Sequence, residues 1–321
     1  MASDGTRVGR VAHETRSEEG PAAVVERCIH ALREARDLAA EVASDVVGVG
    51  ISSPGPVDPF RGIVVDPPNL GSAFHDVALG PLVADALGLP AALDRDTNVA
   101  ALGEWTFGVA RGCSDFLYVT VSTGIGGAVV SDGRLLRGPD GTAGELGHTT
   151  VDLDGPICGC GARGHLEAIA SGRALARDAR AAVDDRRSPF LSARAAERLD
   201  VDARAVADGE AAGDRACRDL MERARRAFAA AVVSWVDLFD PELIIVGGSI
   251  AEHEGDRLLD PARLAVERHA FRAPARRVRI VAPDLGPDVS LAGAHPLVMS
   301  RLHGSVSETV GTALVGHSVP A

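Results

Sequence analysis

Short apolar segments alternate with longer amphipathic ones along most of the chain, and this alternation constrains its fold most strongly. Val46–Ser52 is a short apolar run followed by Ser-Pro-Gly-Pro, which is typical of a buried strand that ends in a turn. Pro21–Ala43 instead carries its apolar residues at helical spacing. Because strands and helices alternate in this way, the sequence predicts an α/β protein.

The same criteria predict the other elements. Further strands are expected at Arg7–Arg16, Gly62–Val65, Ala91–Leu93, Phe116–Val121, Gly126–Val130, Leu243–Val246 and Val278–Val281. Further helices are expected at Val77–Leu87, Asn98–Phe107, Glu167–Phe239 with breaks near 184–189 and 211–213, and Leu291–Leu302. The tail after Gly304 is rich in small residues and is expected to fray. A length of 321 residues corresponds to about two domains, which we place at 1–115 and 116–321.

Composition excludes several classes of function. The net charge of −12 argues against a nucleic-acid surface built on bulk positive charge. All 33 basic residues are arginine, which excludes mechanisms that need a catalytic lysine. No apolar run approaches the roughly 20 residues that span a membrane, and Met1–Gly20 has no signal-peptide core. The sequence therefore predicts a cytoplasmic protein without a nucleic-acid or membrane partner.

The most specific local motif combines histidine and cysteine. His148, Cys158, Cys160 and His165 are spaced as Gly-His-x9-Cys-Gly-Cys-Gly-x-x-Gly-His. Two thiolates and two imidazoles form a reasonable tetrahedral Zn²⁺ site, and the glycines let a short loop wrap the ion. The alternative is a pair of free cysteines in a glycine-rich turn. The other three of the five cysteines are isolated and are interpreted as small core residues.

Two glycine-rich turns follow apolar strands, at Thr120–Gly127 and at Val246–Ser249. Such turns expose backbone N–H groups that can hold a phosphate. Many hairpins contain similar glycines, so each turn taken alone is also compatible with a plain structural role.

Several carboxylates follow predicted strands or flank the cysteine motif. Asp96 lies in Asp94-Arg95-Asp96-Thr97-Asn98, where a strand leads into a helix, and can act either as a general base or as a helix cap. Glu145 precedes His148 by three residues, and Glu167 follows His165 by two. A metal-bound loop would hold these two side chains rigid; otherwise they are solvated surface glutamates.

Taken together, these segments resemble the ROK family, best known for bacterial sugar kinases. The resemblance extends from about Asp4 to Leu302 and rests on the order of seven elements. These are Pro54-Gly55-Pro56-Val57-Asp58, Pro68-Asn69-Leu70, Asp96-Thr97-Asn98, Ser122–Gly127, Gly144-Glu145-x-x-His148, the segment Cys158–Glu167, and Asp240–Gly248.

The resemblance implies an actin-like ATPase (ribonuclease H-like) fold, in which two α/β domains enclose a cleft and the last helix returns to the first domain. It implies phosphorylation of a hexose, most simply glucose, by ATP and Mg²⁺, with Asp96 as the general base. The implied sugar-binding residues are Asn69, Gly55, Arg95, Glu145, His148 and Glu167. The implied nucleotide-binding residues are Thr123, Gly124, Gly126, Gly127, Gly247 and Gly248. A structural zinc would be held by His148, Cys158, Cys160 and His165, and a homodimer is implied by analogy.

Three departures from the family pattern stand out. The last zinc ligand is usually cysteine and is His165 here, and the residue before the base is usually asparagine and is Arg95 here. The first strand of the family, with its Asp-x-Gly-Gly-Thr phosphate turn, has no counterpart, because Asp4-Gly5-Thr6 matches a later hairpin. We hypothesise that the true start lies upstream, which an in-frame motif in the genomic DNA would test. The alternatives to a glucose-phosphorylating kinase are a non-catalytic sugar-binding or regulatory protein and an N-acylhexosamine kinase.

Overall fold

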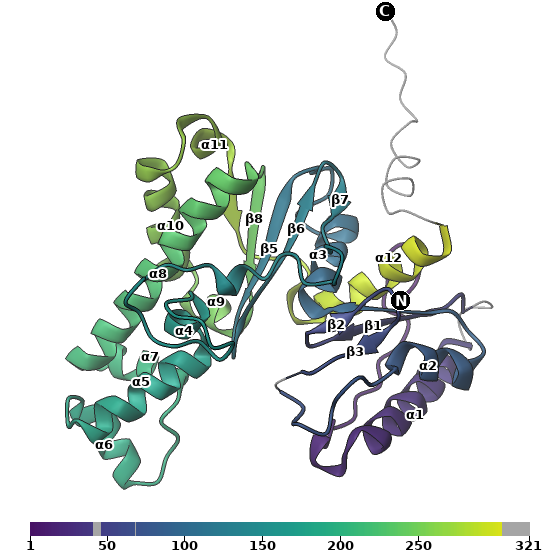
Figure 1. The fold of residues 1–321 in the computed structure, drawn as a ribbon, viewed down its shortest axis with the longest axis horizontal. Helices are drawn as coiled ribbons and strands as arrows, with labels where there is room; N and C mark the ends of the chain where they lie inside the picture. Colours follow the sequence, from purple (N-terminus) through teal and green to yellow (C-terminus); the bar gives the residue numbers. More distant parts are fainter. Residues whose placement is uncertain (41–45, 68, 304–321) are drawn as a thin grey trace, which may run out of the picture. The chain divides into compact units, whose positions relative to one another are not determined.

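The computed structural model describes residues 1–40, 46–67 and 69–303, and the predicted frayed tail lies outside them. The described chain forms two compact units (Figure 1). The first unit contains residues 1–114, 132–143 and 283–303, and the second contains residues 115–131 and 144–282. No helix among the described residues is long and apolar enough to cross a membrane.

The described residues of the first unit form short strands and four α-helices. Its elements are η1 (Ser17–Glu19), α1 (Pro21–Ala40), β1 (Val49–Ser53), β2 (Val57–Asp58), β3 (Ile63–Val64), α2 (Leu79–Leu87), β4 (Ala91–Arg95), α3 (Asp96–Phe107), β7 (Arg134–Leu135), η3 (Gly286–Asp288) and α12 (Val289–His303). Strands β1 and β4 pair in parallel from Val49↔Ala91 to Ser53↔Arg95, and β2 pairs antiparallel with β3.

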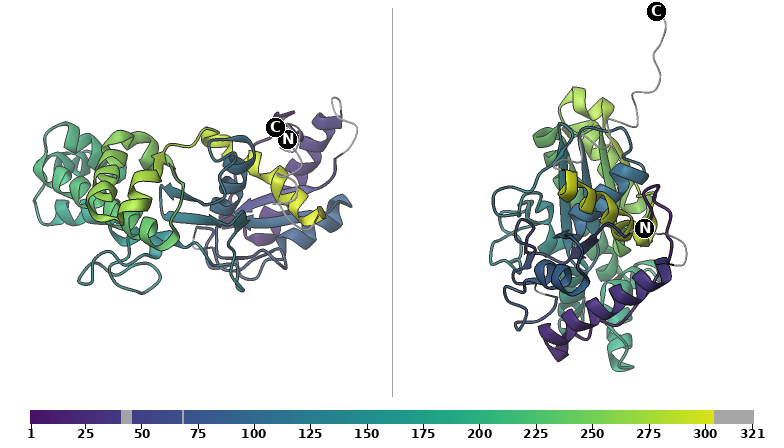
Figure 2. Two further views of the ribbon diagram at one scale, coloured as in Figure 1. Left: turned by 90° about the horizontal axis from the view of Figure 1, so that it is seen from above. Right: turned by 90° about the vertical axis from the view of Figure 1, so that its right-hand side faces the viewer.

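Helix α12 packs closely on α3 and on β1 (Figures 1 and 2). Glycine makes this approach possible, because a Cβ at Gly293 would overlap the carbonyl oxygen of Val99 in α3. A Cβ at Gly50 in β1 would likewise overlap the backbone of Ala294 in α12. Residues from the end of the described chain thus help to fix β1, and through its partner β4 they support the turn that carries Asp96.

The second unit is built on a twisted sheet covered by helices. Its elements are β5 (Phe116–Val121), β6 (Ile125–Ser131), η2 (Leu146–His148), α4 (Glu167–Ala170), α5 (Gly172–Asp184), α6 (Pro189–Ala196), α7 (Ala203–Ala211), α8 (Arg215–Phe239), β8 (Leu243–Gly247), α9 (Ser249–Glu254), α10 (Asp256–His269), α11 (Arg272–Arg277) and β9 (Arg279–Val281). The strand order is β6-β5-β8-β9, with β5 antiparallel to β6 and parallel to β8.

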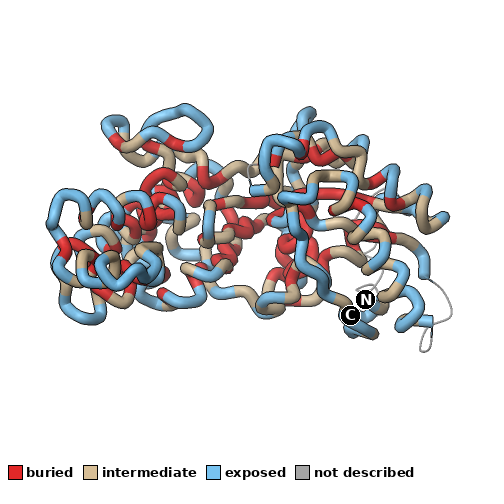
Figure 3. The backbone as a smooth tube through the Cα atoms, turned by 90° about the horizontal axis from the view of Figure 1, so that it is seen from below, coloured by how far each residue is buried: buried red, intermediate tan, exposed pale blue. Residues whose placement is uncertain are grey.

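Burial explains why β5 and β8 occupy the middle of this sheet. Every residue of β8 is buried, and so is every residue of β5 except Thr120, which is typical of parallel strands covered on both faces. Trp235 and Phe228 of α8 pack edge to face with ring centroids 6.0 Å apart in the same core. Figure 3 shows the buried residues gathered inside each unit, with exposed residues along the outer helices.

Most predicted elements are present, with shifts of a few residues at their ends. The strand predicted at Arg7–Arg16 is wrong: this segment forms no strand, most of its residues are exposed, and none pairs with a described strand. The prediction missed the two-residue strands β2 and β7 and the helices α9–α11. Glu41–Ala43, the end of the first predicted helix, lie outside the described residues.

Candidate active site and metal centre

Asp96 is the first residue of α3, directly after the buried strand β4. It is exposed, whereas the neighbouring Arg95, Thr97 and Asn98 are buried. Its Oδ1 accepts the backbone N–H of Thr97 at 2.8 Å, and a carboxylate is favourable in the first turn of a helix. The fold therefore holds the Asp96 backbone rigidly while it leaves the carboxylate accessible to a reactant.

A buried carboxylate that the sequence analysis did not select supports this turn. Asp94 is fully buried, and its Oδ1 accepts the N–H of Arg95 at 2.8 Å and the side-chain amide of Asn98 at 2.7 Å. Its Oδ2 accepts Nε of Arg137 at 2.7 Å. Asp94 thus joins the end of β4 to the first turn of α3, and Arg137 balances its charge.

Arg95, the unusual residue beside Asp96, is only 2% exposed. Its guanidinium donates to the carbonyl oxygen of Ala143, and its aliphatic stem lies beside Gly55, where a Cβ would be 3.2 Å from Cδ. The structure therefore brings Gly55, Arg95 and Asp96 together. Asn69 is exposed in a separate turn, and Pro68 of its motif lies outside the described residues.

The four predicted zinc ligands converge in the second unit. One ligand atom from each of His148, Cys158, Cys160 and His165 lies within 4.8 Å of the other three. The two Nδ1 atoms are 3.1 Å apart, Cys160 Sγ is 3.3 Å from His165 Nδ1, and Cys158 Sγ is 3.8 Å from His148 Nδ1. Tetrahedral Zn²⁺ with bonds of about 2.0–2.3 Å places its ligand atoms about 3.3–3.8 Å apart, and two of the three separations lie in this range while the third is slightly shorter, so the cluster is compatible with this ion.

Burial shifts the pKa of two members of the cluster. Burial raises the pKa of the Cys158 thiol. Burial lowers the pKa of His165, and the neighbouring His148 acts in the same direction. A divalent cation bound between these four side chains would convert the two thiols to ligating thiolates.

The segment from His148 to Glu167, called the metal loop below, has a backbone that is fixed by contacts of its own. Leu166 N–H bonds to the Thr149 carbonyl at 2.9 Å, so the two ends of the loop are joined beside His148 and His165. Trp235 of α8 donates to Thr149 Oγ1 at 2.8 Å and ties the loop to the core. Gly164 has a φ of 71°, and a Cβ there would overlap the carbonyl oxygen of Asp152. The loop geometry is therefore set by glycine and by backbone pairing as well as by the four ligands.

Glu145 and Glu167 lie next to the predicted metal ligands, as their positions in the sequence suggested. Glu145 Oε2 is 4.0 Å from Nε2 of His148, on the side of the imidazole opposite the cluster. Glu167 Oε2 accepts the N–H of Ile125 at 2.8 Å and also lies beside Gly124. Glu167 therefore links the metal loop to the glycine-rich turn between β5 and β6.

The two glycine-rich turns lie together at the carboxyl ends of β5 and β8. Thr120 is paired with Gly247, and the hydroxyls of Ser122 and Ser249 are 2.9 Å apart. Gly248 has a φ of 96°, and a Cβ there would be 2.6 Å from the carbonyl oxygen of Val121. The carboxyl edge of parallel strands is where α/β sheets commonly bind ligands, and Thr123 is exposed at this edge.

The glycines of the first turn have different surroundings. Gly124 lies in the turn, and Gly126 is a partly buried residue of β6. Gly127 faces Leu146, because a Cβ there would be 2.5 Å from Leu146 Cγ. Gly127 therefore has a packing reason to be glycine, and its contact with phosphate stays a prediction.

Two comparisons by sequence place the chain among known proteins. The ROK family model matches residues 6–301. The chain belongs to the ROK family. It is 34% identical over 304 residues to a glucokinase of Thermotoga maritima, covering 95% of this chain and 94% of the relative. It is 35% identical over 267 residues to an N-acetylmannosamine kinase of Citrobacter koseri, covering 82% and 84%.

Solved structures of ROK proteins agree with the fold. The ROK hexokinase of Thermus thermophilus has a TM-score of 0.77 and 34% identity and covers 94% of each chain. A ROK glucokinase of Streptomyces griseus in complex with glucose and AMPPNP has a TM-score of 0.71 and 30% identity, with 91% of this chain and 92% of that chain covered. The predicted actin-like α/β fold is therefore confirmed.

Gly147 offers a test of the metal-loop geometry. A Cβ at Gly147 would overlap the carbonyl oxygen of Ile125, so Gly147→Ala should displace η2 and His148 from β6. We expect a loss of about 3 kcal/mol in the free energy of unfolding, together with reduced zinc content. Gly159→Ala is the matched control, since nothing lies within 4 Å of its Cβ position. Chemical denaturation and metal analysis of both variants would check this, and equal behaviour would contradict it.

Proposed function

We propose that this chain transfers the γ-phosphoryl group of ATP to a hydroxyl of a hexose, with glucose as the substrate and glucose 6-phosphate as the product. The observation that carries the proposal is the exposed carboxylate of Asp96, held at the start of α3 by buried neighbours. Identity of 34% to a glucokinase over nearly the whole chain supports the choice of glucose.

In this reaction Asp96 accepts the proton of the sugar hydroxyl as its oxygen attacks the γ-phosphorus. A new O–P bond forms, the bond from the γ-phosphorus to the ADP oxygen breaks, and ADP leaves with its electron pair. Phosphoryl transfer depends mainly on positioning and charge stabilisation, so the rigid backbone of Asp96 matters as much as its basicity. Asp94 contributes by holding Arg95 and Asn98 on either side of this residue.

The residues that the family resemblance implies for the sugar are retained in this proposal. In the first unit these are Asn69, Arg95 and the backbone at Gly55. In the second unit they are Glu145, His148 and Glu167, whose side chains flank the metal loop. Carboxylate and imidazole groups placed for hydroxyls give selectivity, because a sugar without the matching hydroxyl leaves them unpaired.

The nucleotide is expected at the carboxyl edge of β5 and β8. Backbone groups at Thr123 and Gly124, with Gly126 and Gly127 behind them, would approach the phosphates, and Gly247 and Gly248 would approach the rest of the nucleotide. Mg²⁺ accompanies ATP and neutralises charge on its phosphates. No lysine is needed in this arrangement, which agrees with the composition of the chain.

Zinc has a structural role in this proposal. His148, Cys158, Cys160 and His165 would hold the ion and thereby fix the loop between His148 and Glu167, two groups assigned to the sugar. His148 suits both tasks, because Nδ1 faces the other ligands while Nε2 faces Glu145. We also propose that the protein is cytoplasmic, because the reaction consumes ATP. A homodimer is proposed by analogy with the family.

An N-acylhexosamine kinase is the second candidate, favoured by the 35% identity to an N-acetylmannosamine kinase. A coupled assay of ADP release with glucose and N-acetylmannosamine would distinguish the two. We expect kcat/KM for glucose to be at least about tenfold higher. The reverse preference would select the second candidate. Binding of either sugar without turnover would indicate a non-catalytic sugar-binding protein.

A further inference from the structure

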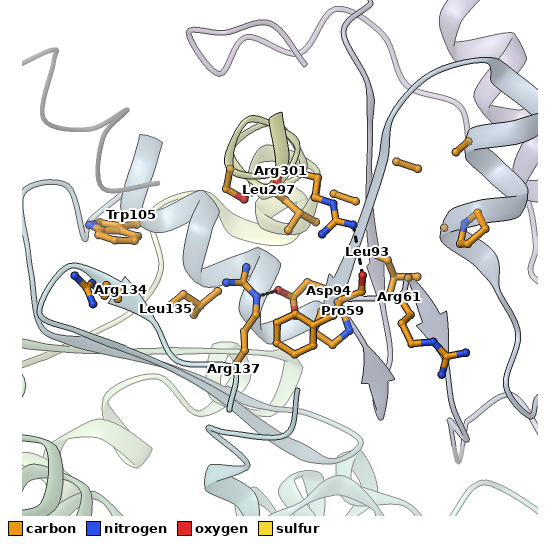
Figure 4. A pocket seen from close by; sticks show the side chains of 18 of the residues that line it. Pro59, Arg61, Leu93, Asp94, Trp105, Arg134, Leu135, Arg137, Leu297 and Arg301 are labelled. Carbon is orange, nitrogen blue, oxygen red and sulfur yellow. Dashed lines mark hydrogen bonds and ion pairs between the residues drawn. The ribbon is translucent and has the colours of Figure 1, made fainter. Parts of the chain in front are cut away.

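A pocket of about 740 Å³ lies entirely within the first unit and contains none of the residues assigned to sugar, nucleotide or zinc (Figure 4). One wall is β4, from Ala91 to Asp94. The other walls come from α2, from the last turns of α12, and from residues 133–137 around β7. Its volume falls in the range of sites that hold small organic ligands.

The charge of this pocket is opposite to that of the chain. Four arginines line it, Arg61, Arg134, Arg137 and Arg301, and Asp94 is the one carboxylate in the lining. The whole chain has a net charge of −12. A pocket with this excess of guanidinium groups attracts anions and disfavours neutral sugars as its main ligand.

Two of the arginines have no carboxylate to balance them. Among the described residues, no carboxylate oxygen lies within 4.0 Å of Arg134 or Arg301, whereas Arg61 reaches Asp58 at that distance. Within the described part of the chain, Arg301 donates a single long bond of 3.4 Å, to the carbonyl oxygen of Phe60. Both guanidinium groups are therefore available to an anion, and a guanidinium binds phosphate oxygens in a bidentate manner.

Arg137 is positioned more firmly than the others. Its Nε donates to the buried Asp94, and no other described group accepts a hydrogen bond from its Nη atoms. Figure 4 shows Arg137 beside Asp94 in the middle of the pocket, with Arg134 near Trp105 at one end and Arg61 at the other. The Asp94 contact fixes the guanidinium in place, so binding at its Nη atoms would cost little side-chain entropy.

The rest of the lining suits a carbon skeleton. Phe60, Leu135 and Leu297 contribute apolar surface, and Ser300 contributes a hydroxyl. Inorganic phosphate would use the arginines and leave this apolar surface in water. We propose that the pocket binds a small organic phosphate, with its phosphate on the lining guanidinium groups and its carbon skeleton against the apolar wall.

Calorimetry on the full chain, saturated with glucose and AMPPNP so that the catalytic site is occupied, would test this. The probes are glucose 6-phosphate, glycerol 3-phosphate, phosphoenolpyruvate and inorganic phosphate. We expect at least one ester to bind about tenfold more tightly than inorganic phosphate. Failure of every ester to bind, or equal binding of inorganic phosphate, would overturn the proposal.

Variants would locate the binding. Arg134→Gln/Arg301→Gln should weaken the ester by about tenfold or more, and Arg268→Gln/Arg272→Gln is the control with the same change of charge on exposed residues. Arg137 is left in place, because its loss would strand the buried Asp94. Ser300→Trp fills the pocket without a change of charge and should also abolish binding. Undiminished binding in both pocket variants would contradict this location.

Discussion

Asp96→Asn should lower kcat for hexose phosphorylation by about 10²- to 10⁴-fold and leave the Kd for the hexose nearly unchanged. Asparagine keeps the size of the side chain and can still accept the N–H of Thr97, but it cannot take the hydroxyl proton. Because Asp96 is exposed, the free energy of unfolding should change by less than about 1 kcal/mol. Steady-state kinetics and sugar titration of the purified variant would measure both effects.

Asp256→Asn is the matched control, since Asp256 is also an exposed carboxylate at the start of a helix, α10. It should retain the kcat of the parent chain. An unchanged kcat in Asp96→Asn would refute its assignment as general base, and a loss of hexose binding would show that it has a binding role instead.

Cys160→Ser should remove about one zinc ion per chain and destabilise the second unit by roughly 5 kcal/mol, less than the ~10–16 kcal/mol of peptides that fold only with zinc. Cys160 is exposed, so the substitution itself costs little packing and the effect reports the metal. Activity should fall as well, because the loop between His148 and Glu167 loses its anchor. Metal analysis and thermal denaturation of both proteins would measure the change.

Cys28→Ser is the control for this substitution. Cys28 is an isolated cysteine of α1 in the first unit, and burial raises its pKa, as expected for an inert thiol. Its replacement should leave the zinc content at one per chain. A parent chain purified without zinc, and not stabilised when zinc is added, would contradict the metal assignment.

The sequence predicted the buried strands of the second unit well, because β5 and β8 are apolar on both faces and are closed by glycine turns. The segment Arg7–Arg16 misled the prediction. It carries β-branched residues, yet a strand also needs a partner, and composition contains no information about pairing. Strands β2 and β7 have two residues each and are too short for any periodicity to indicate.

The cluster of His148, Cys158, Cys160 and His165 could be predicted because all four lie within 18 residues and their chemistry is specific. Asp94 and Arg137 could not, because they meet across 43 positions and each alone is an ordinary charged residue. The position of Asp94, directly after a predicted strand and two residues before Asp96, could have indicated its role beside the candidate base. The pocket lined by Arg61, Arg134, Arg137 and Arg301 could not be predicted either, because its walls come from three separate parts of the sequence that the fold brings together.

Phosphoryl transfer to a hexose can be observed directly by ³¹P NMR of the reaction mixture. The full chain would be incubated with zinc, Mg²⁺, ATP and glucose, with Asp96→Asn as the parallel sample. We predict that the γ-phosphate signal of ATP is replaced by that of a sugar phosphomonoester, with ADP in equal amount, and that this is much slower in the variant. Release of inorganic phosphate alone, or an unchanged ATP spectrum with the parent chain, would contradict the assignment of the chain as a hexose kinase.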